Sequence, residues 1–254
     1  MKKTVQVRNV VIGEGLPKIC VSIMGKTKEA LIEEIHYIKE LDIDVVEWRM
    51  DHYDKIDELQ MVKETVNQIR SELGNIPLLA TFRSKSEGGE KELNEEAYIK
   101  LNEEIIASEE VDLIDVELFL GDEPVKDLVE FAHTHNVKVV MSNHDFDQTP
   151  AKDEIISRLC KMQDLNADLP KIAVMPQSID DVLCLLCATN EMVTKYADRP
   201  IITMSMSGKG TISRIAGEIF GSALTFGAAK EASAPGQVEV NKLRNTLKII
   251  HDAQ

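Results

Sequence analysis

The sequence predicts an α/β protein, a single (β/α)₈ TIM-type barrel with an N-terminal β-hairpin. Eight short apolar runs alternate with segments of helical spacing, and eight such units in about 240 residues favour a closed parallel barrel over an open sheet. The length of 254 residues is compatible with one large barrel or two small domains. No G-x-G-x-x-G fingerprint follows the first run, where a doubly wound sheet would usually carry one.

Each predicted strand is a short apolar run, and a helical segment follows each run. The predicted strands are residues 18–24, 44–50, 76–83, 113–118, 137–144, 171–176, 200–206 and 222–227. The predicted helices are residues 27–41, 57–73, 94–109, 122–135, 151–165, 179–196, 210–219 and 238–252. In the first helix Leu31, Ile35, Ile38 and Leu41 form one apolar stripe, as an amphipathic helix requires.

The first 17 residues contain TVQVRNVVIGEG, which predicts a small hairpin at the bottom of the barrel. The chain shows no low-complexity tract, no domain-scale linker and no repeat beyond the strand–helix unit. We therefore expect residues 1–254 to form a single barrel domain, with residues 1–17 as its hairpin.

The composition excludes several classes of partner. A formal net charge of −15 argues against nucleic acid and anionic membranes, because phosphate binding needs a basic surface. The chain has no apolar run of about 18 residues and no signal-peptide block, so we expect a cytoplasmic protein without a membrane span. The cysteines form no disulfide framework, and the CLLC stretch at 184–187 is better explained by buried core cysteines than by a redox or zinc site.

One face of the predicted strands is unusually polar. Alternate residues of a strand point to opposite sides, and in each strand the other set is apolar enough to pack on the outer helices. The charged set should therefore point into the barrel: it comprises Glu47, Arg49, Arg83, Asp115, Glu117, His144 and Lys171. A structural ion-pair network is the alternative, above all for Asp115 and Glu117. As a whole the set indicates a functional site, because charges clustered in a concavity perturb one another.

Lys171 stands inside the apolar run KIAVMP, between Pro170 and Pro176. Buried, unpaired ammonium groups are costly, so this position needs an explanation. One explanation is a lysine at the bottom of the barrel that points to solvent, as we expect for Lys18 and Lys138. The other is an amine in a tight pocket beside other cations, which loses its proton readily and can attack a carbonyl to form an imine.

Six stretches, in this order, closely resemble type I 3-dehydroquinate dehydratase (3-dehydroquinase). They are EWRMD, TFRSKSEGGE, SNHDF, PKIAVMP, TMSMSGKGTISRIAGEIFGSALTFG and ASAPGQ, and the resemblance covers nearly the whole chain. It implies a cofactor-free, metal-free (β/α)₈ barrel that acts as a homodimer in the shikimate pathway of aromatic amino acid biosynthesis. The implied reaction is removal of water from 3-dehydroquinate to give 3-dehydroshikimate through a lysine Schiff base.

The resemblance also implies a role for each matching residue. Lys171 forms the imine, His144 transfers protons, and Glu87 orients His144. From the residues alone, Glu87 would be an exposed loop acid in SKSEGGEKE. Arg214 matches the clamp on the substrate carboxylate, which suits a bidentate guanidinium. Further residues match substrate-binding positions or an apolar wall: Ser22, Glu47, Arg49, Arg83, Ser233, Gln237, Met204, Met206 and Phe226. Plain core packing is the alternative for the methionines.

Other functions fit the residues less well. SGKGT at 207–211 lacks the upstream glycine of a phosphate loop, and HTH at 133–135 lacks a third metal ligand. A class I (Schiff-base) aldolase on the same barrel is the alternative enzyme; product analysis separates the two, because dehydration gives a conjugated enone and aldol cleavage gives two carbonyls. A non-catalytic barrel that binds polyhydroxy acids would bind without turnover. The small-residue loop at 230–238 is predicted to be a lid over the mouth.

Overall fold

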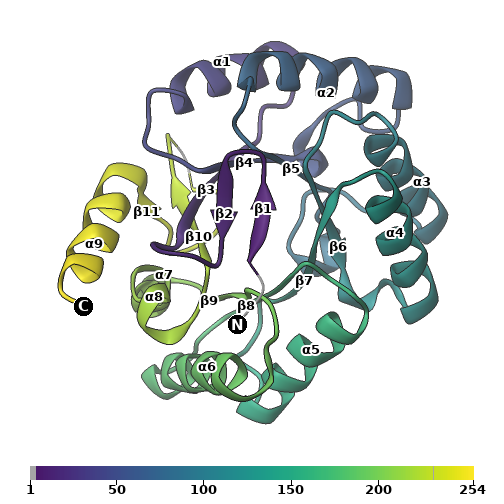
Figure 1. The fold of residues 1–254 in the computed structure, drawn as a ribbon. Helices are drawn as coiled ribbons and strands as arrows, with labels where there is room; N and C mark the ends of the chain where they lie inside the picture. Colours follow the sequence, from purple (N-terminus) through teal and green to yellow (C-terminus); the bar gives the residue numbers. More distant parts are fainter. Residues whose placement is uncertain (1–3, 231) are drawn as a thin grey trace.

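The computed structural model describes residues 4–230 and 232–254 of the chain. Eight parallel strands form the barrel wall: β3 (Lys18–Ile23), β4 (Val45–Arg49), β5 (Leu78–Thr81), β6 (Leu113–Glu117), β7 (Lys138–Asp145), β8 (Leu169–Val174), β9 (Ile202–Ser205) and β10 (Leu224–Ala228). A two-residue strand, β11 (Val238–Glu239), extends the sheet in parallel beside β10. Figure 1 shows the helices as an outer ring around these strands. The predicted TIM-type barrel is confirmed.

The barrel closes between β9 and β10. Their segments meet through a parallel bridge between Ile201 and Ser222, and the amide of Ala223 donates to the carbonyl of Ile201 at 2.9 Å. The Ser222 hydroxyl accepts from the Thr203 amide at 3.0 Å and so takes part in the same seam. On its other side β10 pairs with β3, which completes the ring.

The outer helices follow the predicted alternation. They are α1 (Lys28–Ile38), α2 (Leu59–Leu73), α3 (Glu95–Ile106), α4 (Asp122–Thr134), α5 (Lys152–Asp164), α6 (Ile179–Glu191), α7 (Thr211–Ile215), α8 (Gly217–Phe220) and α9 (Val240–Asp252). The predicted helix 210–219 is two short helices instead. Gly217 lies where they meet, and a Cβ there would stand 2.8 Å from the carbonyl oxygen of Ser222. The helix must break here to let the chain turn close beneath the seam.

The predicted N-terminal hairpin is present as antiparallel strands β1 (Val5–Val7) and β2 (Val10–Ile12). Residues 1–3 of the predicted segment lie outside the described residues. Figure 1 shows the hairpin across one end of the barrel. The side chains of Val5 and Ile12 are buried in one apolar cluster with barrel residues that include Leu79 and Leu169, near the start of their strands. The hairpin therefore seals the end opposite the C-terminal ends of the strands.

The interior of the barrel is apolar at the bottom and charged above. Cys20, Val45, Leu113 and Val140 belong to the apolar cluster under the hairpin. Two residues further along, the same inward parity carries the polar residues Ser22, Glu47, Asp115 and Ser142, and Lys171 follows Leu169 in the same way. The opposite parity packs on the helices, with Trp48, Ile114 and Ile172 in the outer core. The predicted assignment of faces is confirmed.

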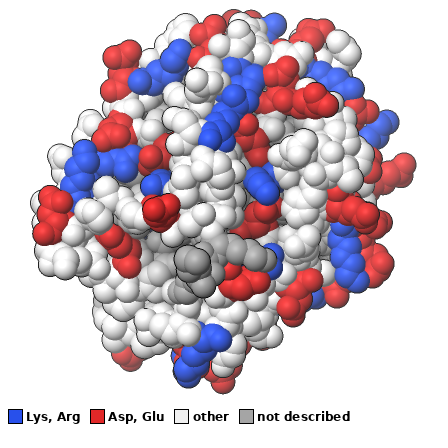
Figure 2. All heavy atoms as spheres, viewed as in Figure 1, with Lys and Arg blue, Asp and Glu red and all other residues white. Residues whose placement is uncertain are grey.

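The cysteines differ in their exposure to solvent. All four cysteines are free, and Cys20 is buried, but Cys187 is exposed on α6, so the prediction that it is a core residue was wrong. Cys187 lies on the side of α6 that faces solvent. On the face seen in Figure 2, acidic and basic side chains are interspersed. In the described part of the chain, no helix is both long and apolar enough to cross a membrane.

Candidate active site

Lys171 is the third residue of β8 and points into the lumen. The residue is only 3% exposed, and its Nζ lies 3.4 Å from Asp115 Oδ2 and 4.7 Å from the centre of the Phe226 ring. The strand begins at Leu169, two residues earlier than predicted, so Lys171 stands above the apolar bottom layer. The expected alternative of a solvent-facing lysine at the bottom is wrong for Lys171, whereas Lys18 and Lys138 are both half-buried at the first positions of their strands.

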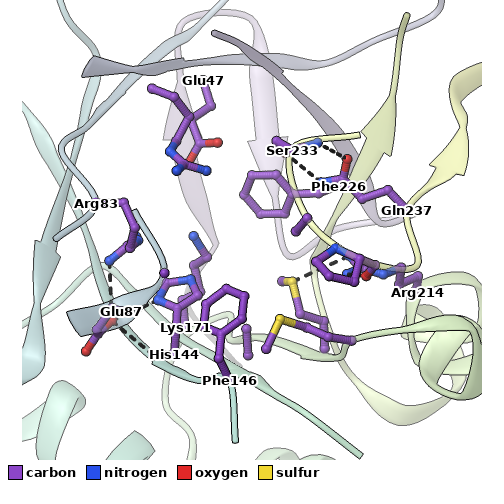
Figure 3. A pocket seen from close by; sticks show the side chains of 17 residues that line it. Glu47, Arg83, Glu87, His144, Phe146, Lys171, Arg214, Phe226, Ser233 and Gln237 are labelled. Carbon is purple, nitrogen blue, oxygen red and sulfur yellow. Dashed lines mark hydrogen bonds and ion pairs between the residues drawn. The ribbon is translucent and has the colours of Figure 1, made fainter. Parts of the chain in front are cut away.

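His144 and Glu87 form a directed pair at the end of β7. Glu87 Oε2 accepts from the His144 backbone amide at 3.0 Å and lies 2.9 Å from His144 Nδ1. When Glu87 is ionised its carboxylate can only accept, so Nδ1 carries the proton and Nε2 remains free to take one. Because Glu87 Oε2 contacts both the backbone amide and the ring of His144, it fixes the orientation of the ring relative to the backbone. In Figure 3, Glu87, His144 and Lys171 lie on one side of the cavity.

The two glycines after Glu87 explain how a loop acid turns back toward β7. Glu87 ends a 3₁₀ turn at Lys85–Glu87, and Gly88 follows with φ of +84°. A Cβ on Gly88 would stand 2.3 Å from the Phe146 ring, and one on Gly89 would stand 1.9 Å from the Arg83 carbonyl oxygen. Phe146 in turn stacks on His144, with ring centres 6.4 Å apart. The two glycines after Glu87 are therefore required because any side chain at either position would collide with its neighbours and displace Glu87 from His144.

Arg83 neutralises the carboxylates that surround the lysine and the histidine. Its guanidinium lies 2.8 Å from Asp115, 2.7 Å from Glu117 and 3.4 Å from Glu87. It also donates to the Ser142 hydroxyl at 2.9 Å, and Ser142 donates to Asp115 at 2.7 Å. Isolated buried charges are very costly, so this many ionised groups can share the lumen only because they are paired and hydrogen-bonded.

The surroundings shift the proton affinities of the buried acids and of the imidazole. Burial, followed by the charges of Arg83 and Lys171, holds the pKa of His144 well below its usual range. Burial raises the pKa of Glu87 to about 7, against the opposing charge of Arg83. Burial acts in the same direction on Asp115, but Arg83 and Lys171 outweigh it and lower the pKa of that carboxyl. The imidazole is therefore neutral at neutral pH and able to act as a base.

Arg214 is a buried cation on the opposite side of the cavity. It is 1% exposed, its Nη2 donates to the Pro235 carbonyl at 3.0 Å, and its Nη1 lies 3.6 Å from Met204 Sδ. Within residues 4–230 and 232–254, its Nε has no hydrogen-bond partner and no carboxylate pairs with it. Burial lowers the pKa of Arg214 to about 10, so the guanidinium remains charged at neutral pH. An unpaired buried guanidinium facing a cavity is suited to an anionic ligand.

A chain of hydrogen bonds joins the barrel to the loop that covers the mouth. Ser22 Oγ donates to Glu47 Oε2 at 2.5 Å and lies 2.9 Å from Ser233 Oγ. Gln237 donates to the same Ser233 hydroxyl at 2.8 Å and accepts from the Ser233 amide at 2.9 Å. Glu47 also accepts from Thr81 at 2.9 Å. Residues 232–237 therefore lie over the cavity; residue 231 of the predicted lid is outside the described residues.

The cavity brings together the residues predicted from the sequence. It has a volume of about 200 Å³ and so admits a small molecule. Its lining contains Lys171, His144, Glu87, Glu47, Arg49, Arg83, Arg214, Ser233, Gln237, Met204, Met206 and Phe226. Ser22 does not line it and reaches it only through Glu47 and Ser233. Arg49 is held by Asp51, with two contacts of 2.8 Å.

Sequence reasoning gave no specific role in the chemistry to several residues of the site, although it placed Asp115 in the lumen and Pro235 in the lid. Phe146 and Pro235 line the cavity, and Asp115 contacts the lysine beneath it. Phe146 could have been found, because it lies at the end of the SNHDF motif, two residues after His144. Across the described ranges, no group of three or more His, Cys, Asp or Glu side chains could hold a metal ion.

Fold and cavity together define a (β/α)₈-barrel enzyme that carries a buried lysine beside a histidine–carboxylate pair. A family model described as type I 3-dehydroquinase matches residues 19–254. The chain is 59% identical over 252 residues to the 3-dehydroquinate dehydratase of Clostridium botulinum, with 99% of both chains covered. It is 58% identical over 251 residues to that of Clostridioides difficile, with 99% of this chain and 98% of the relative covered.

Solved structures give the same result. A type I 3-dehydroquinate dehydratase from Clostridium difficile, described with covalently modified comenic acid, superposes with a TM-score of 0.98 at 57% identity over 100% of both chains. The 3-dehydroquinate dehydratase of Geobacillus kaustophilus superposes with a TM-score of 0.96 at 39% identity over 99% of both chains. The chain belongs to the type I 3-dehydroquinase family, a family of hydro-lyases.

Proposed function

We propose that this chain removes water from 3-dehydroquinate, giving 3-dehydroshikimate, through a Schiff base on Lys171. One observation carries the proposal: a buried lysine amine and a neutral, carboxylate-oriented imidazole line one small cavity, opposite an unpaired buried guanidinium. The names of the relatives support the substrate. The covalently modified acid in the Clostridium difficile structure supports a covalent step.

The first step is attack of the neutral Lys171 amine on the substrate carbonyl. The carbonyl oxygen leaves as water with one amine proton and one proton taken from solvent, and the new C=N bond keeps the other amine proton and the positive charge. Asp115, 3.4 Å from Nζ, is placed to stabilise that charge. Hydrolysis later returns one water to the carbon and frees the lysine, so this water cancels in the overall reaction.

The second step is elimination. The iminium draws electrons from the adjacent C–H bond, so the neutral His144 takes that proton at Nε2 while Glu87 holds Nδ1–H. The electron pair shifts toward the nitrogen and returns to expel the hydroxyl on the next carbon. His144, now protonated, supplies the proton with which that hydroxyl leaves as water. The substrate has then lost one C–H proton and one hydroxyl.

Binding requires a carboxylate clamp and partners for the hydroxyls. We assign the carboxylate to Arg214, whose Nε and cavity-facing side have no counter-ion in the described part of the chain. The hydroxyl and carbonyl groups fall to polar residues of the rim, and the ring rests on an apolar wall. The polar set is Ser22, Glu47, Arg49, Arg83, Ser233 and Gln237, and the wall is Met204, Met206 and Phe226.

Two measurements test this function. Purified protein given 3-dehydroquinate should produce the ultraviolet absorbance of a conjugated enone, whereas an aldolase would give two smaller carbonyl products. Borohydride added with the substrate should inactivate the enzyme and leave a reduced adduct on Lys171 by peptide mapping. Lys171→Met should fold, but it should neither turn over 3-dehydroquinate nor form an adduct with it under borohydride. Turnover with no adduct, or with an adduct on another lysine, would refute the Schiff base.

We also propose that the enzyme is a homodimer. Large apolar side chains are exposed on three neighbouring helices: Ile179 and Leu183 on α6, Ile212 on α7 and Ile219 on α8. Exposed apolar clusters mark association sites more often than single exposed residues do. Light scattering should give twice the chain mass, and Leu183→Asp should reduce it. A monomeric wild type would refute this proposal.

A cytoplasmic location and a single domain of residues 1–254 complete the proposal. The enzyme names of the relatives support the location, and the burial of Val5 and Ile12 against the barrel supports a hairpin that belongs to the domain. Cell fractionation tests the first. The single domain predicts one cooperative unfolding transition for the whole chain, and it predicts that Val5→Asp lowers the free energy of unfolding in that transition.

A further inference from the structure

Behind Glu87, on the side away from the cavity, lies a second hydrogen-bonded pair to which the mechanism above gives no role. Asn143 precedes His144 on β7 and is 2% exposed. Its Nδ2 donates to Glu87 Oε1 at 3.2 Å, while Arg158 of α5 donates from Nη1 to its Oδ1 at 2.9 Å. Glu87 is thus contacted from β7 on both oxygens, by Asn143 on one and by His144 on the other.

We infer that Asn143 and Arg158 are positioning residues that fix the Glu87 carboxylate against His144. This inference rests on the proposed function for its meaning, but its geometry does not depend on the substrate.

Arg158 decides which end of the amide faces Glu87. A guanidinium carries only donors, so it must face the carbonyl oxygen of Asn143. The NH₂ group then points at the carboxylate. Arg158 is itself held in place by Glu154, which accepts from its Nε at 2.7 Å, and by the Phe119 ring, 5.4 Å from the guanidinium carbon. Without Arg158, the amide could turn its oxygen toward Glu87 and repel it.

The same contact controls when Glu87 is ionised. A hydrogen bond to a carboxylate favours its charged form, so the Asn143 amide lowers the pKa that burial raises. The other charged or titratable groups that face Glu87 are Arg83 after β5, Asp115 and Glu117 on β6, and His144 on β7. The groove behind Glu87 also contains Glu95, Tyr98 and Asp145. Asn143 is the neutral donor of this set, and it adds no charge to a crowded site.

The experiment follows the Glu87–His144 pair in the substrate-free protein. The ¹⁵N signals of the His144 ring, assigned by difference from His144→Gln, should report the titration of Glu87 near pH 7. In Asn143→Ala the midpoint should move upward by about one pH unit, because the lost hydrogen bond favoured the charged form. Arg158→Met keeps the stem over Phe119 and should shift the midpoint in the same direction, by less.

Glu154→Gln is the matched control. It removes only the charge at a half-exposed position, because the glutamine oxygen can still accept from Arg158 Nε, and it should leave the midpoint unchanged. If Asn143→Ala fails to fold, Arg158→Met against Glu154→Gln decides alone. An unmoved midpoint in Arg158→Met, or an equal shift in the control, would overturn the inference. If the wild type turns over substrate, the acid limb of the pH–activity profile should shift in each variant in the same direction as the midpoint of its Glu87 titration. A wild type without turnover would refute the proposed function while the ring titration still decides this one.

Discussion

Asp115 Oδ2 lies 3.4 Å from Lys171 Nζ, and neither residue is more than 3% exposed. The carboxylate is neutralised from its other oxygen by Arg83 at 2.8 Å. This arrangement keeps a negative charge beside the atom that becomes an iminium. Glu117 shares Arg83 with Asp115, at 2.7 Å, but makes no contact with the lysine. Both acids therefore contact Arg83 but only Asp115 contacts the lysine, so a substitution of Glu117 is a control for a substitution of Asp115.

Asp115→Asn should slow formation of the Schiff base. A neutral amide cannot compensate the iminium charge, and loss of a hydrogen bond to a charged group is worth about tenfold or more in rate. Reduction by cyanoborohydride, which acts on the protonated imine, should fall off at a lower pH than in the wild type. Glu117→Gln should leave that pH dependence unchanged. If the two substitutions change the pH dependence of reduction equally, Asp115 acts only as a partner of Arg83 and does not stabilise the iminium.

His144→Ala should separate imine formation from proton transfer. The lysine, Asp115 and Arg214 remain, so borohydride should still trap substrate on Lys171. Turnover should fall by at least about 100-fold, the usual contribution of a general acid–base group. His251→Ala, which alters an exposed histidine paired with Glu218, is the control. Near-normal turnover in His144→Ala would remove the imidazole from the mechanism.

Glu87→Gln should inactivate the enzyme and stabilise it above neutral pH. Glu87 has a folded-state pKa of about 7 against an ordinary 4.5, so its contribution to stability is full below 4.5 and lost as the pH rises through about 7. The neutral amide does not undergo this loss. The difference in unfolding free energy, variant minus wild type, should grow between pH 4.5 and 7 to at most about 3 kcal/mol.

Urea unfolding at pH 4.5 and pH 8 measures this difference. Glu92→Gln, an exposed acid of the same loop, should show no comparable pH dependence. A constant difference at the two pH values would show that Glu87 titrates in the folded protein as it does in the unfolded chain.

The fold and the inward face could be predicted because both depend on short-range periodicity. Alternation by two residues placed Glu47, Asp115 and Lys171 in the lumen without any knowledge of their partners. The start of β8 was missed because Pro170 was expected to end the apolar run. A proline near the first residue of a strand is tolerated, and Pro170 lies opposite Met141 in the ladder.

The rest of the site depends on contacts that periodicity does not encode. Glu87 follows a strand and sits in a hydrophilic loop; only the tight packing of Gly88 against Phe146 and of Gly89 against Arg83 turns it toward His144. Its role came from the family resemblance. Arg158 lies on an outer helix and contacts Asn143, which belongs to β7, so no pattern within one strand could reveal that contact.

The loop at residues 232–237 depends on a tight turn at Gly236. Gly236 has φ of +81°, and a Cβ there would stand 2.2 Å from the Ser207 carbonyl oxygen. The neighbouring Pro235 carbonyl accepts from the Ser207 amide at 3.2 Å and from Arg214 at 3.0 Å. Gly236→Ala should therefore displace the loop and free Arg214 from the Pro235 carbonyl. We expect KM to rise about tenfold, because a bound hydroxyl and the clamp lose their positions, with a smaller change in kcat.

Gly208→Ala is the control at the same mouth, since a Cβ there meets nothing within 4 Å. Hydrogen exchange of residues 232–238 should be faster in Gly236→Ala than in the wild type, and should slow in the wild type when substrate is trapped by borohydride. Gln237→Ala, which loses both contacts to Ser233, should raise KM in the same way. Wild-type kinetics in both variants, together with exchange that trapping does not slow, would mean that residues 232–237 are a static rim, and that water is excluded from the imine by the Phe146 and Phe226 rings alone.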